Sequence, residues 1–122
     1  MKDGYQSIAL ETEVLDASPH RLVQMMYEKC INNIGVIKHH MNENNIEKKC
    51  HSINQVLDII GYLKQILNKD NEESRELSHH LMIVYEYVEK QLFMANLKNS
   101  EVYLDNASAQ LMKIKASWDK IA

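Results

Sequence analysis

The sequence contains little proline and little glycine: its 122 residues include one proline and three glycines. This scarcity argues against a loop-rich sheet architecture, because strands need turn-forming residues at each connection. No apolar run approaches the roughly 18 residues that would span a bilayer as a helix, and the N-terminus leads into no signal-peptide core. We therefore predict an all-α protein that lies in the cytoplasm and does not insert into a membrane.

Cysteine is also scarce, and positive charge is not in excess. We expect Cys30 and Cys50 to be reduced, buried thiols, because a secreted domain of this size more often carries a paired framework; a disulfide between them is the less favoured alternative. The formal net charge of −3 gives no general attraction to phosphate, and Lys48 and Lys49 follow directly after Glu47. Nucleic acid is therefore not an expected partner.

The sequence shows no arrangement that is typical of a catalytic or metal site. It has no glycine-rich phosphate loop. Its six histidines include the pairs His39-His40 and His79-His80, but neighbouring helical residues point ~100° apart and do not easily share one ion. A di-iron bundle needs two inward Glu-x-x-His units, and Glu76 to His79 is the only one. We expect no enzyme activity, no cofactor and no metal.

One helix start is defined almost residue by residue. Ser18 can cap a helix with its hydroxyl, and Pro19 follows at a first-turn position where a proline loses no hydrogen bond. We therefore divide the chain into an N-terminal arm, residues 1–17, and a helical bundle, residues 18–122. The arm contains enough apolar side chains to dock either on its own bundle or on another chain.

Apolar residues then recur at three- and four-residue steps in four segments, 19 to about 41, 45 to about 67, about 73 to 97, and 101 to the end. Helices of similar length joined by short polar turns pack as an antiparallel, up-and-down four-helix bundle, which is the fold that we predict. The expected inward residues are Val23, Met26, Tyr27, Cys30, Ile34, Ile37 and Met41; Ile46, Cys50, Ile53, Leu57, Ile60 and Leu67; Leu77, Leu81, Val84, Tyr85, Val88, Leu92 and Ala95; and Leu104, Ala107, Leu111, Ile114, Trp118 and Ile121.

More apolar residues are present than this core requires. They are either flank residues covered by neighbouring helices or a surface for a partner helix, for which methionine and tyrosine are well suited. Gly35 and Gly61 lie inside predicted helices at a cost of about 1 kcal/mol each, which we attribute to close helix approach rather than to a bend made for a partner. The surplus residues are Leu22, Met25 and Val36; Ile59, Tyr62, Leu63 and Ile66; and Ile83, Tyr87 and Met94.

The sequence also resembles a known family. Residues 17–28 read Ala-Ser-Pro-His-Arg-Leu-Val-Gln-Met-Met-Tyr-Glu, which resembles the first-helix signature of the FliS family of flagellin export chaperones. Tyr5 lies at the usual offset before this signature, and Glu28-Lys29-Cys30 departs from the usual Asp-Gly-Ala. Further similar segments are Asp58-Ile59-Ile60 with Leu63, Tyr85-Glu86-Tyr87, Ala95-Asn96-Leu97-Lys98-Asn99 and Ala116-Ser117-Trp118.

This resemblance implies a cytoplasmic four-helix chaperone that binds the C-terminal segment of flagellin, which is disordered in the monomer and helical on the chaperone. Binding would prevent premature polymerisation and keep flagellin competent for flagellar type III export. Components of the export gate are further candidate partners. We expect a monomer or a weak homodimer.

We predict that flagellin contacts the surplus apolar residues and that the arm covers part of this surface in the free protein. The alternative is a homo-oligomeric helical adaptor or structural protein that uses the same residues for self-association; a metal-dependent bundle enzyme ranks lower. The predicted partner-binding residues are Tyr5, Ile8, Leu10, Leu22, Met25, Ile59, Leu63, Ile66, Ile83, Tyr87 and Met94.

Overall fold

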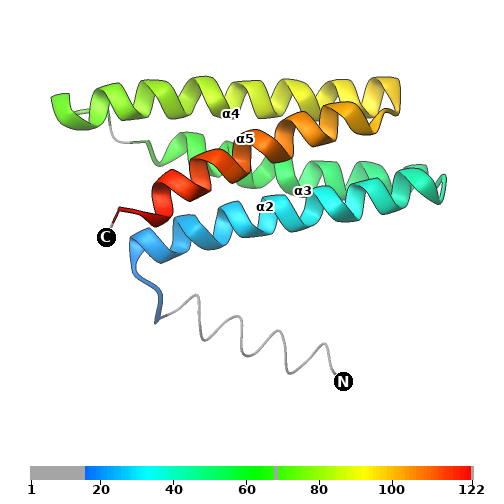
Figure 1. Cartoon of the computed structure of the whole chain (residues 1–122), viewed down its shortest axis with the longest axis horizontal. Helices are drawn as coiled ribbons and strands as arrows, with labels where there is room; N and C mark the ends of the chain where they lie inside the picture. The colour runs from blue at the N-terminus through cyan, green and yellow to red at the C-terminus, as the bar shows by residue number, and fades with distance from the viewer. Residues whose placement is uncertain (1–15, 68, 122) are drawn as a thin grey trace.

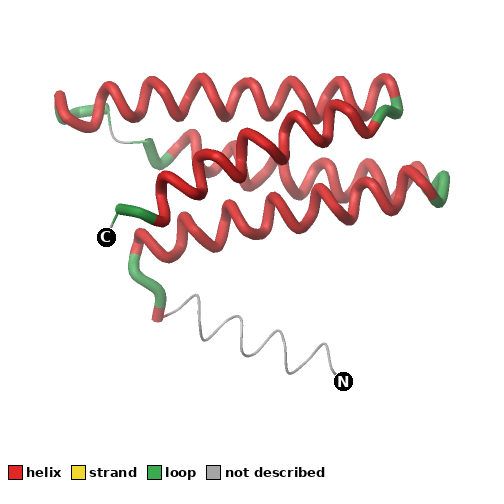
Figure 2. Tube along the Cα trace, in the orientation of Figure 1, coloured by secondary structure: helices red, strands yellow, loops and turns green. Residues whose placement is uncertain are grey.

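The computed structural model describes residues 16–67 and 69–121, and this part of the chain is organised as four long helices (Figure 1). They are α2 (Pro19–Asn42), α3 (Ile46–Gln65), α4 (Glu72–Lys98) and α5 (Glu101–Asp119). The described residues include no strand (Figure 2). The predicted all-α class is confirmed. The arm residues Tyr5, Ile8 and Leu10 lie outside the described part.

Each helix packs against two others. Helix α2 contacts α3 and α5, and α4 contacts the same two helices from the opposite side. Successive helices run in opposite directions, so the α2–α3 and α4–α5 turns share one end of the bundle, while the α3–α4 connection shares the other end with the start of α2 and the end of α5 (Figure 1). The up-and-down four-helix bundle is confirmed.

Local capping explains where the helices begin and end. Ser18 Oγ accepts the amide N–H of Arg21 at 3.1 Å, as expected for the residue before Pro19. The side chains of Asn45 and Asn71 cap α3 and α4 in the same way. Helix α4 ends at Asn99, whose left-handed φ of 50° is typical of a residue that closes a helix. The Ser18 cap is a local interaction, which is why the sequence predicts it well.

Most of the predicted core residues are buried, with three corrections at helix ends. Ile46 is 70% exposed and Leu77 is 45% exposed, and Ile121 is also exposed. Ile46 is the first residue of α3, Leu77 lies near the start of the long α4, and Ile121 follows the end of α5, so none of the four described helices covers them. Six other predicted core residues are only half-buried: Val23, Met26, Cys50, Leu57, Leu67 and Trp118.

The inward face of helix α3 is rotated from the predicted one, although Ile53 and Ile60 are buried as predicted. Leu63 is only 1% exposed, although we expected it to lie beside the core, and Val56 is buried as well. Val56, Ile60 and Leu63 are spaced by four and three residues, so they lie on one inward stripe; Ile60 belongs to the predicted stripe as well, whereas Val56 and Leu63 replace Leu57 at its other side. Leu63 therefore belongs to the core rather than to a free surface.

The two helical glycines are not explained by close packing. A Cβ atom built on Gly35 or on Gly61 meets nothing within 4 Å, and neither glycine has a positive φ. Our expectation of a close helix approach at these positions is therefore wrong.

Candidate functional site: an apolar cavity at one end of the bundle

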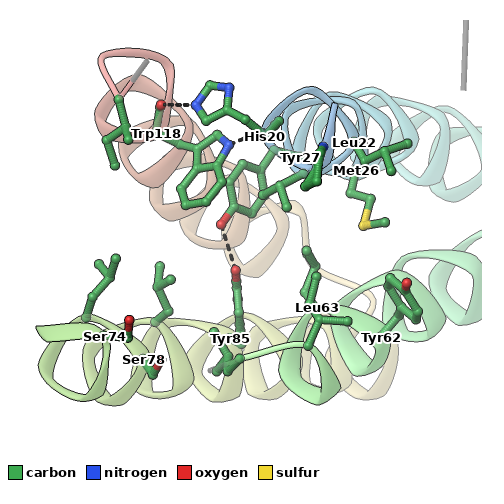
Figure 3. Close-up of a pocket in the computed structure, with 17 residues that line it drawn as sticks. His20, Leu22, Met26, Tyr27, Tyr62, Leu63, Ser74, Ser78, Tyr85 and Trp118 are labelled. Atoms are coloured by element: carbon green, nitrogen blue, oxygen red, sulfur yellow. Dashed lines mark hydrogen bonds between the residues drawn. The ribbon is translucent and has the colours of Figure 1, made fainter. Parts of the chain in front are cut away.

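A cavity of about 600 Å³ lies at the end of the bundle where α2 and α4 begin and α3 and α5 end. All four helices contribute to its lining (Figure 3). The wall consists mainly of aliphatic and aromatic side chains, including Leu22 and Met26 from α2 and Ile66 from α3. The cavity is a place where apolar matter can be bound, because it is concave, apolar and open to the surface.

The cavity exists because α4 has small side chains at its first inward positions. Ser74 and Ser78 line the cavity at places where a bundle helix usually carries leucine or isoleucine. Large residues return further along the same face, with Leu81 and Tyr85. Side chains of α4 therefore fill the interior of the bundle from Tyr85 onward, but not at the first two turns of α4.

The mouth of the cavity is rimmed by exposed apolar residues. Tyr62, Ile66 and Leu77 line the cavity and are each exposed to solvent to a large extent. Leu22 and Met26 lie beside them and are half-buried. Exposed contiguous apolar patches of this kind are typical of interaction sites.

One side of the rim is closed by a contact between His20 at the start of α2 and Trp118 at the end of α5 (Figure 3). The two rings are stacked, with centroids 5.0 Å apart and planes inclined by 10°. The Nε2 of His20 donates to the main-chain oxygen of Trp118 at 2.8 Å, and Nε1 of Trp118 donates to the main-chain oxygen of His20 at 3.0 Å. This pair of reciprocal bonds ties the two helix ends together.

A polar contact supports the same helix ends from outside. Gln24 Nε2 donates to Asp119 Oδ1 at 2.7 Å, and Lys115 Nζ donates to Asp119 Oδ2 at 2.7 Å. The bond from Lys115 and the bond from Gln24 hold the pKa of the Asp119 carboxyl below its usual value. The negative charge of Asp119 is therefore kept at neutral pH, and with it the link between α2 and α5.

The floor of the cavity is formed by two tyrosines on diagonally opposite helices. The hydroxyl of Tyr27 from α2 lies 2.6 Å from the hydroxyl of Tyr85 from α4. Both side chains are buried, and the rings of Tyr27 and Trp118 are nearly perpendicular, with centroids 6.5 Å apart. Burial raises the pKa of both tyrosines, so both hydroxyls keep their protons at neutral pH.

The structure brings together only part of the predicted partner-binding set. Leu22, Leu63 and Ile66 line the cavity, although Leu63 does so as a core residue. Met25 and Ile59 are half-buried outside the lining. The sequence reasoning missed the contributions of His20, Trp118 and Ser78, because these depend on which helix ends meet.

The predicted residues on α4 lie elsewhere. Gln91 of α4 contacts Asn106 of α5, and Tyr87 and Met94 lie four residues before and three residues after Gln91, on the same face. The face of α4 toward α3 is marked instead by Glu89, which pairs with Lys64. Ile83 and Tyr87 are exposed. The predicted partner-binding residues of α3 and those of α4 therefore lie on different sides of the bundle and do not form one groove.

Other features of the described residues are less developed. A cavity of about 300 Å³ lies near the α2–α3 turn, where Lys49 Nζ donates to Asn99 Oδ1 at 3.1 Å. Within residues 16–67 and 69–121, histidine, cysteine and acidic side chains form no group of three or more that could hold a metal ion. None of the described helices is both long enough and apolar enough to cross a membrane.

Comparison with known proteins identifies the family. The whole chain, residues 1–122, matches the family described as flagellar protein FliS. The chain belongs to the FliS family. It is 35% identical over 118 residues to the flagellar secretion chaperone FliSB of Pseudomonas aeruginosa, and this match covers 97% of the chain and 92% of the relative. The flagellar secretion chaperone FliS of Vibrio cholerae is 30% identical, with 97% and 85% covered.

More distant FliS relatives match over a similar length. The flagellar secretion chaperone FliS of Salmonella typhimurium is 25% identical over 120 residues, which cover 98% of this chain and 87% of the relative. The names of these FliS relatives describe a chaperone and not an enzyme. An open apolar cavity in a four-helix bundle is the kind of site that a chaperone can use.

Proposed function

We propose that this chain is a cytoplasmic export chaperone that binds the C-terminal segment of flagellin. The observation that carries the proposal is the apolar cavity with its exposed rim, in a protein of the FliS family. An amphipathic helix binds such a site by placing side chains at i, i+3, i+4 and i+7 into it. A bound segment would be kept from polymerising before export.

The cavity and the adjoining surface of α3 form the primary binding site in this proposal. Leu22 and Met26 of α2 offer apolar area at the mouth, and Tyr62 and Ile66 of α3 continue it. Ile59 lies three residues before Tyr62 on the same side of α3 and extends this surface. Met25 is half-buried near the start of α2 and belongs to the same end of the bundle.

A second part of the cargo would contact the α5 side of α4. Ile83 and Tyr87 are exposed there, and Met94 follows at the same helical phase. Because this stripe is separate from the cavity, one straight helix does not reach both. The cargo segment is therefore expected to bind as at least two helical pieces joined by a bend.

The arm would cover the cavity in the free protein and be displaced by cargo. Tyr5, Ile8 and Leu10 supply apolar side chains of the size that the cavity accepts. A weak intramolecular occupant protects apolar surface from water and from wrong partners. The cost of displacing it, together with the cost of ordering the cargo, limits affinity and allows release at export.

Calorimetric titration with a peptide that spans the last ~40 residues of a co-encoded flagellin tests this function, with circular dichroism recorded on the same samples. We expect saturable binding, a negative heat-capacity change and a gain of helix. No binding by a folded sample would contradict the proposal. If light scattering then showed concentration-dependent self-association, the homo-oligomeric alternative would take its place.

The location of the site is tested by charge substitutions. Ile66→Glu places a carboxylate at the mouth of the cavity, where it would be desolvated by a bound helix, so we expect at least a tenfold loss of affinity. Val102→Glu is the matched control, because Val102 is also an exposed apolar residue but lies at the start of α5, at the other end of the bundle. Equal affinities of the two variants would place the cargo elsewhere.

A further inference from the structure

A second cavity, of about 300 Å³, lies between the α2–α3 turn and the α4–α5 turn. These two turns share the end of the bundle that is opposite the apolar cavity (Figure 1). Most side chains around the second cavity are polar. The lining residues are His40, Met41, Asn44, Asn45, Ile46, Lys49 and Asn99. This described lining therefore contains a lysine and no acidic side chain.

Lys49 of α3 is the one charged side chain that is buried in the described part of the chain, with 7% of its surface exposed. Its Nζ donates to Oδ1 of Asn99 at 3.1 Å. Asn99 lines the second cavity and is exposed, so the ammonium lies at the open wall of the cavity. An ammonium has three donors, and the bond to Asn99 uses one of them. The other two have no acceptor among the described residues.

The positive charge of Lys49 is not balanced by a negative charge nearby. None of the ion pairs between described residues includes Lys49, whereas the half-buried Lys64 on the same helix pairs with Glu89. Asn99 offers Lys49 only a neutral amide oxygen. A carboxylate stabilises a buried ammonium more than a neutral oxygen does, because the hydrogen bond is then formed between opposite charges. The second cavity therefore favours an anionic group over a neutral one.

We propose that the second cavity binds a carboxylate of the cargo segment through the ammonium of Lys49. This inference rests on the proposed function. The carboxylate belongs either to the last residue of flagellin or to an aspartate or glutamate side chain, because both present the same chemical group. A carboxylate held at one point fixes the register of a helix that could otherwise slide along an apolar surface.

The second cavity is within reach of cargo that is bound to α4. Asn99 follows Met94, the last residue of the apolar stripe on α4, by five residues, which is about 7.5 Å along a helix axis. A cargo piece that lies on this stripe therefore comes to the end of the bundle that carries Lys49. Because the apolar cavity is at the opposite end, the two cavities would hold the cargo at separate points.

The first test is calorimetric titration of full-length Lys49→Met with the flagellin C-terminal peptide. Methionine has a similar length but no charge, so we expect the affinity to fall about tenfold or more. Lys48→Met is the matched control, because Lys48 is adjacent and exposed and the change in net charge is the same. It should change the affinity by less than about twofold. Equal affinities of the two variants would overturn the inference.

A second set of titrations identifies the carboxylate on the cargo. In one peptide the C-terminal carboxylate is converted to an amide, and in the others each aspartate or glutamate is replaced in turn by asparagine or glutamine. One of these changes should weaken binding to the wild-type chain about tenfold and have little effect on binding to Lys49→Met. Loss on amidation assigns the terminal carboxylate, and loss on a side-chain replacement assigns that acidic residue. If none of the changes weakens binding to wild type, the inference is wrong, whether or not Lys49→Met folds.

Denaturant unfolding of Lys49→Met separates binding from a purely structural role. If this variant is less stable than wild type but binds the peptide as Lys48→Met does, Lys49 only ties the start of α3 to the end of α4, and the inference is wrong. A folded wild-type chain that binds no peptide would overturn both this inference and the proposed function. A wild-type chain that binds all the peptides equally well would overturn the inference alone.

Discussion

Asn33 shows how a single polar residue weighs on the stability of the bundle. It lies on α2 with only 7% of its surface exposed, and its Nδ2 is buried without a hydrogen-bond partner among the described residues. A buried amide nitrogen without a partner costs free energy, because its lost water contacts are not replaced.

We predict that Asn33→Leu stabilises the protein by about 1–2 kcal/mol, because leucine has a similar volume and no polar atom to satisfy. Denaturant unfolding followed by circular dichroism measures the change. Asn32→Leu is the control, since Asn32 is adjacent on the same helix but exposed, and it should change stability by less than about 0.5 kcal/mol. A loss of stability in Asn33→Leu would show that the amide has a favourable partner.

Because of Cys30, the free energy of unfolding is expected to depend on pH in the alkaline range. Burial raises the pKa of this thiol from 9.0 to about 12. Between these two values the unfolded chain releases a proton that the folded chain keeps, so the free energy of unfolding falls as the pH rises above 9. Ionisation of this one thiol should lower the free energy of unfolding by about 1.4 kcal/mol per pH unit. The raised pKa values of Tyr27 and Tyr85 lower it further above pH 10.

Denaturant unfolding at a series of pH values from 7.5 to 10.5 measures this effect. Below pH 9 the thiol contributes no slope. Cys30→Ala should be less stable at neutral pH but should show a smaller decline between pH 9 and 10. A thiol reagent gives an independent check, because it should modify the half-buried Cys50 in the folded protein and leave Cys30 intact. Equal slopes for the two proteins would contradict the assignment.

At the scale of the helix, the glycines of α2 and α3 are not required by the fold. Neither Gly35 nor Gly61 has a neighbour within reach of an added Cβ atom, and both lie well inside their helices. Glycine in a helix interior costs about 1 kcal/mol relative to alanine. No packing contact within the described bundle offsets this loss of helix stability.

Gly35→Ala and Gly61→Ala should each raise the free energy of unfolding by about 0.5–1 kcal/mol, and their effects should add, because the two residues are on different helices. Thermal unfolding of the single and double variants measures this. Peptide titration of the same variants shows whether a glycine is needed by a partner. A destabilised alanine variant would mean that the helix must bend or pack more closely than the structure indicates.

Helix α3 also shows how much a repeat pattern leaves open. Apolar side chains occur in many directions around the axis of this helix, so several inward stripes fit the sequence. The apolar residues in α3 and directly after it are Ile53, Val56, Leu57, Ile59, Ile60, Leu63, Ile66 and Leu67. Contact with α2 and α4 selects the stripe that contains Val56, Ile60 and Leu63. On α2 and α5 the predicted stripes largely agree with the buried residues.

At the scale of the whole molecule, the two apolar surfaces define how a cargo segment can be held. The cavity lies at one end of the bundle, and the stripe of Ile83, Tyr87 and Met94 lies on the α5 side of α4. A chaperone with separate surfaces binds a flexible chain better than a rigid helix, because the chain can bend between them.

Two peptides distinguish these surfaces. Tyr87→Glu should weaken binding of the ~40-residue flagellin peptide about fivefold or more, whereas a half-length peptide that fills only the cavity should bind this variant like wild type. Ile66→Glu should weaken binding of both peptides. The comparison is made by calorimetry on the same protein preparations. If Tyr87→Glu left the longer peptide unaffected, the α4 stripe would not be part of the cargo site.

The sequence by itself determined the helical class, the number of helices, most of their ends and the family. These properties depend on interactions within a few residues, such as the Ser18 cap and the repeat of apolar positions, or on similarity along the chain. Only the tertiary structure decided where the cavity lies and what closes it. His20 and Trp118 are 98 residues apart, and the hydroxyls of Tyr27 and Tyr85 are brought together from 58 residues apart, so no local pattern reports these contacts. They arise because up-and-down packing brings the start of α2 and the end of α5 to one end of the bundle, where the small residues of α4 leave the space unfilled.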